Sequence, residues 1–168
     1  MGMTFAQKVL AGAAGLESVV PGQIVAVKPD HLLTHDNTAA IIWKIGDELD
    51  KYGVIRKDMP IIVLDHVTPA ANEKTATGHA NIRKFVAAHG LPNFYDVGTG
   101  VCHQVVVEKG HALPGKILVG SDSHTCSYGA VNAVSTVSSL APSRSALWKL
   151  QSGIAAPTHQ LRKHSISL

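Results

Sequence analysis

The chain has 168 residues, of which 45% are hydrophobic and 16% charged, and its formal net charge is +3. This composition predicts a soluble globular protein rather than a disordered one, and no apolar run reaches the roughly 18 residues of a membrane span. All 12 acidic residues lie within residues 1–122, and the four basic residues that follow are scattered without aromatic neighbours. We therefore expect neither a membrane nor a nucleic-acid partner.

The cysteine count and the first residues bear on cellular location. Cys102 and Cys126 are the only cysteines, too few for a disulfide scaffold, which favours a reducing cytoplasm. The segment MGMTFAQKVLAGAAG lacks a basic start followed by a long apolar stretch, so no signal peptide is expected.

Residues 1–136 alternate short apolar runs with amphipathic segments. Helix caps and apolar spacing predict three helices, over 5–15, over 38–53 and over 71–90. Strands are expected over 23–29, 60–66, 93–98, 104–110 and 116–122, and a further helix is expected to open in GAVNAVST (129–136). The run PIIVLDH is typical of strands that a parallel sheet buries on both faces. The alternation predicts an α/β domain with a largely parallel sheet.

Residues 137–168 break this pattern. They are rich in serine and contain no acidic residue. Two interpretations stay open: a mobile C-terminal extension, or a natural sequence interrupted by a frameshift.

Polar residues follow several of the predicted strands. Asp65-His66 follows IIVL, Asp96 follows NFY, and Asp122-Ser123-His124 follows ILVG. Ligands of open α/β sheets bind beyond the carboxyl ends of the strands, although Asp and Ser at these places also cap the helix that follows. With His103 added, we favour a functional site over separate helix caps.

The residue types allow more than one chemistry. Asp65, His66, His103, Asp122 and His124 could ligate a divalent metal in a hydrolase, although no compact signature such as HExxH is present. A serine hydrolase is disfavoured because GSDSHT is not GxSxG, and no Gly-rich phosphate loop has the required order of residues.

Four blocks together resemble one known family. HDNT at 35–38, DH at 65–66, GTGVCHQ at 98–104 and PGKILVGSDSHTCSYGA at 114–130 are similar to the aconitase superfamily, in particular to the large subunits of 3-isopropylmalate dehydratase and homoaconitase. The similarity runs from about Thr4 to Thr136. It implies an incomplete aconitase-like fold of α/β/α layers. It also implies a cytoplasmic hydro-lyase of leucine biosynthesis that isomerises a small hydroxy acid by dehydration and rehydration at a [4Fe-4S] cluster.

The resemblance assigns roles to residues. Asp65 and His66 match the pair that protonates the departing hydroxyl, and His103, Asp122 and His124 match groups around the iron-bound oxygen. Ser123 matches a residue that hydrogen-bonds a substrate carboxylate, and His35 falls where aconitase has a glutamine that does the same.

The chain also departs from the family pattern. It has no C-x-x-C pair, so the cluster cysteines are absent and no metal ligand is assigned. The base serine and the substrate-binding arginines belong to another domain or to a small, swivel-domain subunit. We therefore expect the front part of a large subunit that is inactive alone, and self-association or aggregation through exposed sheet edges. A metal-dependent hydrolase and a non-catalytic, subunit-binding remnant are the alternatives.

Overall fold

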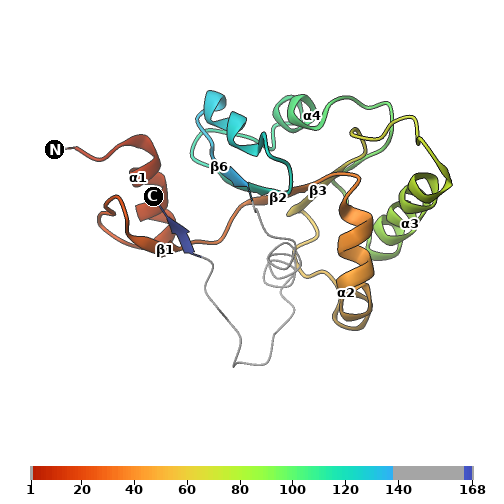
Figure 1. Cartoon of the computed structure of the whole chain (residues 1–168). Coiled ribbons are helices and arrows are strands. Elements are labelled where there is room, and N and C mark those ends of the chain that lie inside the picture. The colour runs from red at the N-terminus through yellow and green to blue at the C-terminus, as the bar shows by residue number, and fades with distance from the viewer. Residues whose placement is uncertain (1, 138–164, 168) are drawn as a thin grey trace.

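The computed structural model of the chain describes residues 2–137 and 165–167 (Figure 1). Its helices are α1 (Phe5–Ala14), α2 (Thr38–Tyr52), α3 (Glu73–His89), α4 (Cys102–Glu108) and the 3-10 helix η1 (Thr125–Val131). Its strands are β1 (Ile24–Ala26), β2 (His31–Thr34), β3 (Pro60–Val63), β4 (Phe94–Tyr95), β5 (Ile117–Gly120), β6 (Val134–Val137) and β7 (Ser165–Ser167). None of the helices within these residues is long and apolar enough to cross a membrane.

A five-stranded sheet forms the centre of the fold, in the order β4-β3-β2-β5-β6. Every neighbouring pair in it is parallel, which confirms the predicted α/β class. A second, two-stranded sheet pairs β1 antiparallel with β7 and lies to one side with α1. Because the five strands are parallel, their carboxyl ends lie along one edge of the sheet.

Helices cover both faces of the five-stranded sheet. On one face α2 and α3 bury Ile45, Leu49 and Ile82 against Leu32 and Ile62 of the sheet. The other face carries α4 and η1, which contribute to a separate set of buried residues: Leu33, Ile61, Val63, Leu118, Val105, Val106 and Tyr128. Alternate residues of β2 and β3 point into the two cores, as expected for strands buried on both faces. The α/β/α layering is therefore confirmed.

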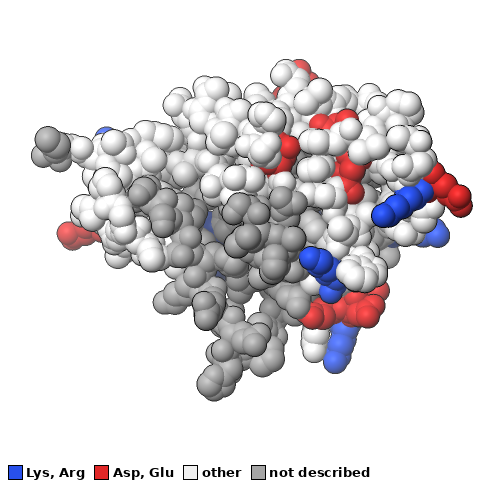
Figure 2. Space-filling model, viewed as in Figure 1, with Lys and Arg blue, Asp and Glu red and all other residues white. Residues whose placement is uncertain are grey.

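Local signals define the ends of helices α1 and α3. Thr4 and Gln7 form a capping box at the start of α1, and Gly15 ends the helix in the left-handed conformation at φ 68°. Asn72 accepts a hydrogen bond from the Thr75 N–H at the start of α3, and Gly90 ends that helix at φ 61°. In Figure 2 both positively charged side chains (Lys and Arg) and negatively charged ones (Asp and Glu) lie over α2 and α3.

Two sequence predictions about elements are wrong, and one strand was not predicted. Residues 104–110, expected as a strand, belong to α4 and the turn after it, because a continuous valine run fits a buried helix as well as a buried strand. The helix expected in GAVNAVST is replaced by the end of η1 and by β6, with Asn132 turning the chain at φ 58°. The central strand β2 was not predicted, because its four residues, HLLT, form too short an apolar run between polar flanks.

Two predictions are left untested by this fold. Of the predicted tail 137–168, residues 138–164 and Leu168 lie outside the described residues. Self-association through the sheet edges, which β4 and β6 form in the described part of the chain, also stays a prediction.

Candidate functional site

The candidate site lies at the carboxyl edge of the five-stranded sheet. His35 follows β2, Asp65 and His66 follow β3, and Asp122 to His124 follow β5. His103 comes from the first turn of α4. The side chains predicted to act together are therefore brought to one place by three parallel strands and one helix.

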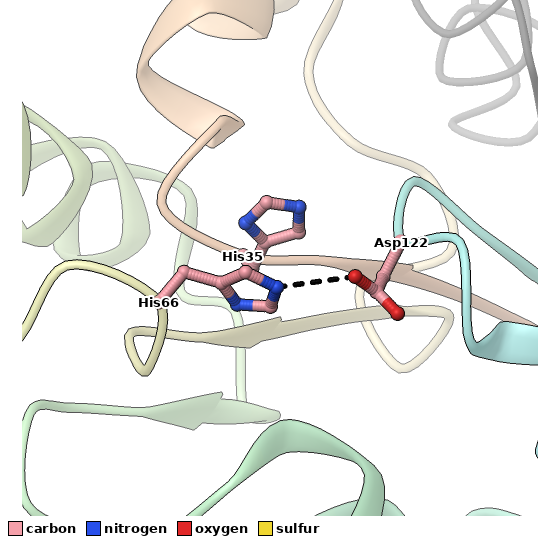
Figure 3. A group of neighbouring side chains, drawn as sticks. All are labelled: His35, His66 and Asp122. Atoms are coloured by element: carbon pink, nitrogen blue, oxygen red, sulfur yellow. Dashed lines mark hydrogen bonds and ion pairs between the residues drawn. The ribbon is translucent and has the colours of Figure 1, made fainter.

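His66 lies between the carboxylates of Asp65 and Asp122, and Figure 3 shows the second of these contacts. Its Nδ1 is 2.7 Å from Asp65 Oδ1, and its Nε2 is 3.1 Å from Asp122 Oδ2. A neutral imidazole has one N–H, so only the imidazolium can donate to both carboxylates at once. Burial acts to lower the pKa of His66, but Asp65 and Asp122 outweigh burial and raise it above its ordinary value. The arrangement favours a protonated His66.

Asp122 receives hydrogen bonds from three directions. Besides His66, it accepts from the backbone N–H of His124 at 2.7 Å, and its Oδ1 is 2.6 Å from His103 Nε2. Burial of this carboxylate, whose side chain is 7% exposed, would raise its pKa, but these hydrogen bonds lower the pKa to about 2. Asp122 is therefore ionised at neutral pH and connects two imidazoles.

Asp65 is anchored by α4. Its Oδ2 accepts the backbone N–H of Cys102 at 2.6 Å, at the start of the helix. Because the first N–H groups of a helix have no partner within the helix, a carboxylate here satisfies one of them. The bond leaves Oδ1 to hold His66, so α4 helps fix the orientation of that imidazole.

His35 stacks on His66. Their ring centroids are 3.9 Å apart and the ring planes differ by 19°. Burial lowers the pKa of His35 to about 4, and the neighbouring His66 cation contributes to this lowering, so His35 is neutral at physiological pH. Its buried Nδ1 has no hydrogen-bond partner among the described residues.

Ser123 and His124 are both exposed. The His124 side chain is 79% exposed, and its Nδ1 is 3.5 Å from Asp122 Oδ1 and 3.2 Å from Ser123 Oγ. Asp96, which also follows a strand, does not join this group. It binds Arg83 through two hydrogen bonds of 2.7 Å.

Sequence reasoning missed a supporting pair, Asp36 and His79. Asp36 Oδ2 accepts the backbone N–H of His66 at 2.9 Å and that of Asp65 at 3.3 Å, and its Oδ1 is 2.6 Å from His79 Nε2. His79 is 4% exposed and belongs to α3. The pair fixes the loop that carries Asp65 and His66. Only the position of Asp36 beside His35 hinted at this role.

Tyr128 was missed as well. Its hydroxyl lies 3.0 Å from His103 Nδ1, so both ring nitrogens of His103 have partners. Burial raises the pKa of Tyr128, so the hydroxyl stays protonated at neutral pH. The aromatic residue in the SHTCSYG segment was the only signal for it.

The cysteines do not fit a [4Fe-4S] cluster, which is held by four ligands that are usually thiolates. The chain has two cysteines. Cys102 is fully buried, and burial together with Asp65 raises the pKa of its thiol, which is therefore protonated. Cys126 is exposed. The residues of this chain therefore do not make a cluster site.

Comparison with known proteins finds one family. The model of the aconitase family (aconitate hydratase) matches residues 7–138. The probable 3-isopropylmalate dehydratase large subunit of Methanothermobacter thermautotrophicus is 41% identical over 136 residues, which cover 81% of this chain and 32% of that protein. The 3-isopropylmalate dehydratase large subunit of Aquifex aeolicus is 40% identical over 139 residues, which also cover 81% of this chain and 32% of that protein.

A relative with a different name covers a shorter segment. The probable methanogen homoaconitase large subunit of Methanosarcina mazei is 43% identical over 107 residues, covering 64% of this chain and 27% of that protein. The chain spans about a third of the length of the curated relatives it matches.

Proposed function

This chain belongs to the aconitase family, and on that premise we propose that its Asp/His cluster serves a hydro-lyase that isomerises a hydroxy acid of the 3-isopropylmalate type. The observation that carries the proposal is the position of His66 between Asp65 and Asp122. Of the relatives described above, two are named 3-isopropylmalate dehydratase and one homoaconitase. The substrate class proposed here follows the name 3-isopropylmalate dehydratase.

The chemistry of dehydration explains the need for such a group. Hydroxide is a poor leaving group, so the departing oxygen has to take up a proton. A positioned acid of suitable pKa accelerates such a step by about 100- to 10,000-fold. His66, with both ring nitrogens facing carboxylates, is the group we assign to this transfer, and rehydration returns the proton along the same route.

His103, Asp122 and His124 are proposed to hold the water that leaves and returns. Asp122 is ionised and accepts hydrogen bonds, while the two imidazoles supply N–H groups beside it. Ser123 and His35 are proposed to bind the substrate carboxylate. Ser123 is exposed and His35 has an unpartnered buried nitrogen among the described residues, so both retain hydrogen-bonding capacity.

The remaining parts of the reaction are proposed to come from elsewhere. Relatives of this chain are named large subunits, which indicates a small-subunit partner. A [4Fe-4S] cluster, which family membership suggests for the whole enzyme, would need cysteines that are not in this sequence. We propose that the 168 residues alone do not catalyse the isomerisation, and that the whole enzyme acts in leucine biosynthesis.

A segment exchange tests the proposal. Residues 7–138 of this chain replace the matching segment of the Methanothermobacter thermautotrophicus large subunit, and conversion of 3-isopropylmalate is followed in the presence of the small subunit. The hybrid should be active, and His66→Gln should lower kcat by about 100-fold or more. His89→Gln, on α3 and paired with Asp50, is the control and should leave the rate unchanged. An active hybrid that tolerates His66→Gln would refute the role of His66, and a folded but inactive hybrid would refute the proposed function.

A further inference from the structure

Two imidazoles and one carboxylate converge at the end of β5, and we propose that they bind one divalent transition-metal ion directly. The ligand atoms are His103 Nε2, Asp122 Oδ1 and His124 Nδ1. Oδ1 lies 2.6 Å from the first nitrogen and 3.5 Å from the second, and one ligand atom from each residue lies within 4.8 Å of the others. Two histidines and one carboxylate are a recognised ligand set for ions such as Zn²⁺, Co²⁺ and Fe²⁺.

The spacing is close to what such an ion requires. Zinc binds nitrogen and carboxylate oxygen at about 2.0–2.2 Å, so neighbouring ligand atoms of a tetrahedral site lie roughly 3.3 Å apart. The distance from His124 to Asp122 already has this value within a few tenths of an ångström. The distance from His103 to Asp122 must open by roughly 0.7 Å. The exposed His124 side chain can rotate toward the ion.

Partners behind the ligands hold them in place. His103 Nδ1 lies 3.0 Å from the Tyr128 hydroxyl, and His66 Nε2 lies 3.1 Å from Asp122 Oδ2, the oxygen that the ion does not use. When the ion binds Nε2 of His103, the ring proton moves to Nδ1. The Nδ1–H group can then donate a hydrogen bond to the Tyr128 hydroxyl oxygen. Outer partners of this kind are typical of metal ligands, and their loss costs about 10- to 100-fold in affinity.

Two other groups of potential ligands fit less well. His35, His66 and Asp122 are close together, but the first two rings are stacked, so their in-plane lone pairs do not meet at one point. In the group of Asp65, His66 and Cys102 the thiol is fully buried in the core, away from the solvent that reaches His124. The choice of site therefore rests on ligand direction and on access from solvent.

Metal binding would compete with the proposed function, because His103, Asp122 and His124 cannot ligate an ion and hold the reacting water at the same time. The metal site itself rests on geometry and not on that function. A divalent ion at this place would act as an inhibitor of the whole enzyme.

The test uses the full 168-residue chain after treatment with a chelator. Calorimetric titration with Zn²⁺ should give one ion per chain, and Co²⁺ should give the visible absorption of a four- or five-coordinate ion. His124→Gln, which changes an exposed side chain and leaves the core intact, should weaken Zn²⁺ binding by at least about 100-fold, more than the loss of an outer partner. Tyr128→Phe should weaken it by about 10- to 100-fold.

His89→Gln is the matched control, because His89 is paired with Asp50 away from this edge, and it should bind Zn²⁺ like the unmodified chain. Absence of a stoichiometric ion would overturn the proposal, as would equal affinity in the His124→Gln variant, which would place the ion at other histidines. Since no substrate or small subunit is present, failure here leaves the segment exchange unaffected.

Discussion

Replacing Asp122 by asparagine should destabilise the chain in a pH-dependent way. The pKa of Asp122 is about 2 in the folded chain, against an ordinary value of 3.8. A difference of nearly two pKa units corresponds to about 2 kcal/mol of folding free energy at neutral pH. The asparagine side chain in Asp122→Asn would keep the size of the original but lose this contribution, because it has no charge to offer His66, His103 and the His124 N–H.

The sign of the pH dependence follows from the direction of the shift. Because the pKa of Asp122 is lower in the folded chain than its ordinary value of 3.8, the ionised carboxylate stabilises the folded chain at pH values above 3.8. This contribution is lost as the pH falls from about 4 toward 2. The difference between the two proteins should therefore shrink from about 2 kcal/mol at pH 7 to about 1 kcal/mol near pH 3.

Urea unfolding followed by circular dichroism measures this difference. With a slope of about 2 kcal/mol/M, the midpoint of Asp122→Asn should fall by about 1 M at pH 7. Asp58→Asn is the control, since the Asp58 side chain is 71% exposed and its loss should change stability by less than about 0.5 kcal/mol. Equal midpoints at pH 7, or a difference that persists unchanged at pH 3, would refute the assignment of a strongly depressed pKa to Asp122.

Three further outcomes are expected. Gly120→Ala should destabilise the chain by about 1–3 kcal/mol in urea unfolding, because the added Cβ overlaps the buried Thr125 side chain, whereas Gly12→Ala, with open space inside α1, should be neutral or stabilising. A thiol reagent should label the exposed Cys126 in the native chain and Cys102 only after unfolding, since burial raises the pKa of the Cys102 thiol. In an NMR titration the imidazole of His35 should take up its proton near pH 4, and a midpoint well above that value, close to the 6.5 of an ordinary histidine, would contradict its burial.

Much of the fold could be predicted because local signals agreed with the tertiary structure. The capping residues Thr4 and Asn72 and the terminal glycines mark helix ends within the chain itself, without any distant contact. The valine run of α4 carries no such signal. Its helical start is supported by Asp65, 37 residues away in sequence, which accepts the Cys102 N–H. Strand β2 depends in the same way on pairing with β3 and β5 on its two sides.

In the candidate site, too, residues marked by a local sequence signal could be predicted, and residues that depend on distant contacts could not. Asp65, His66 and Asp122 could be predicted because each comes at the end of an apolar run that is typical of a buried strand. Asp36 could not, because its role requires α3 to bring His79 within 2.6 Å, across 43 residues of sequence. A residue whose partners are backbone N–H groups of another loop leaves no periodic trace in the sequence.

The position of one proton explains how these imidazoles work together. Asp65 and Asp122 together favour a charged His66. The stacked His35 is neutral because burial lowers its pKa, and the repulsion of a second cation at a ring distance of 3.9 Å lowers it further. The site therefore favours a proton on His66 and leaves the neighbouring His35 neutral. Asp36 helps hold His66 in this position, because it accepts hydrogen bonds from the backbone N–H groups of Asp65 and His66. The dehydration proposed above would use this asymmetry, since a single proton must reach a single departing oxygen.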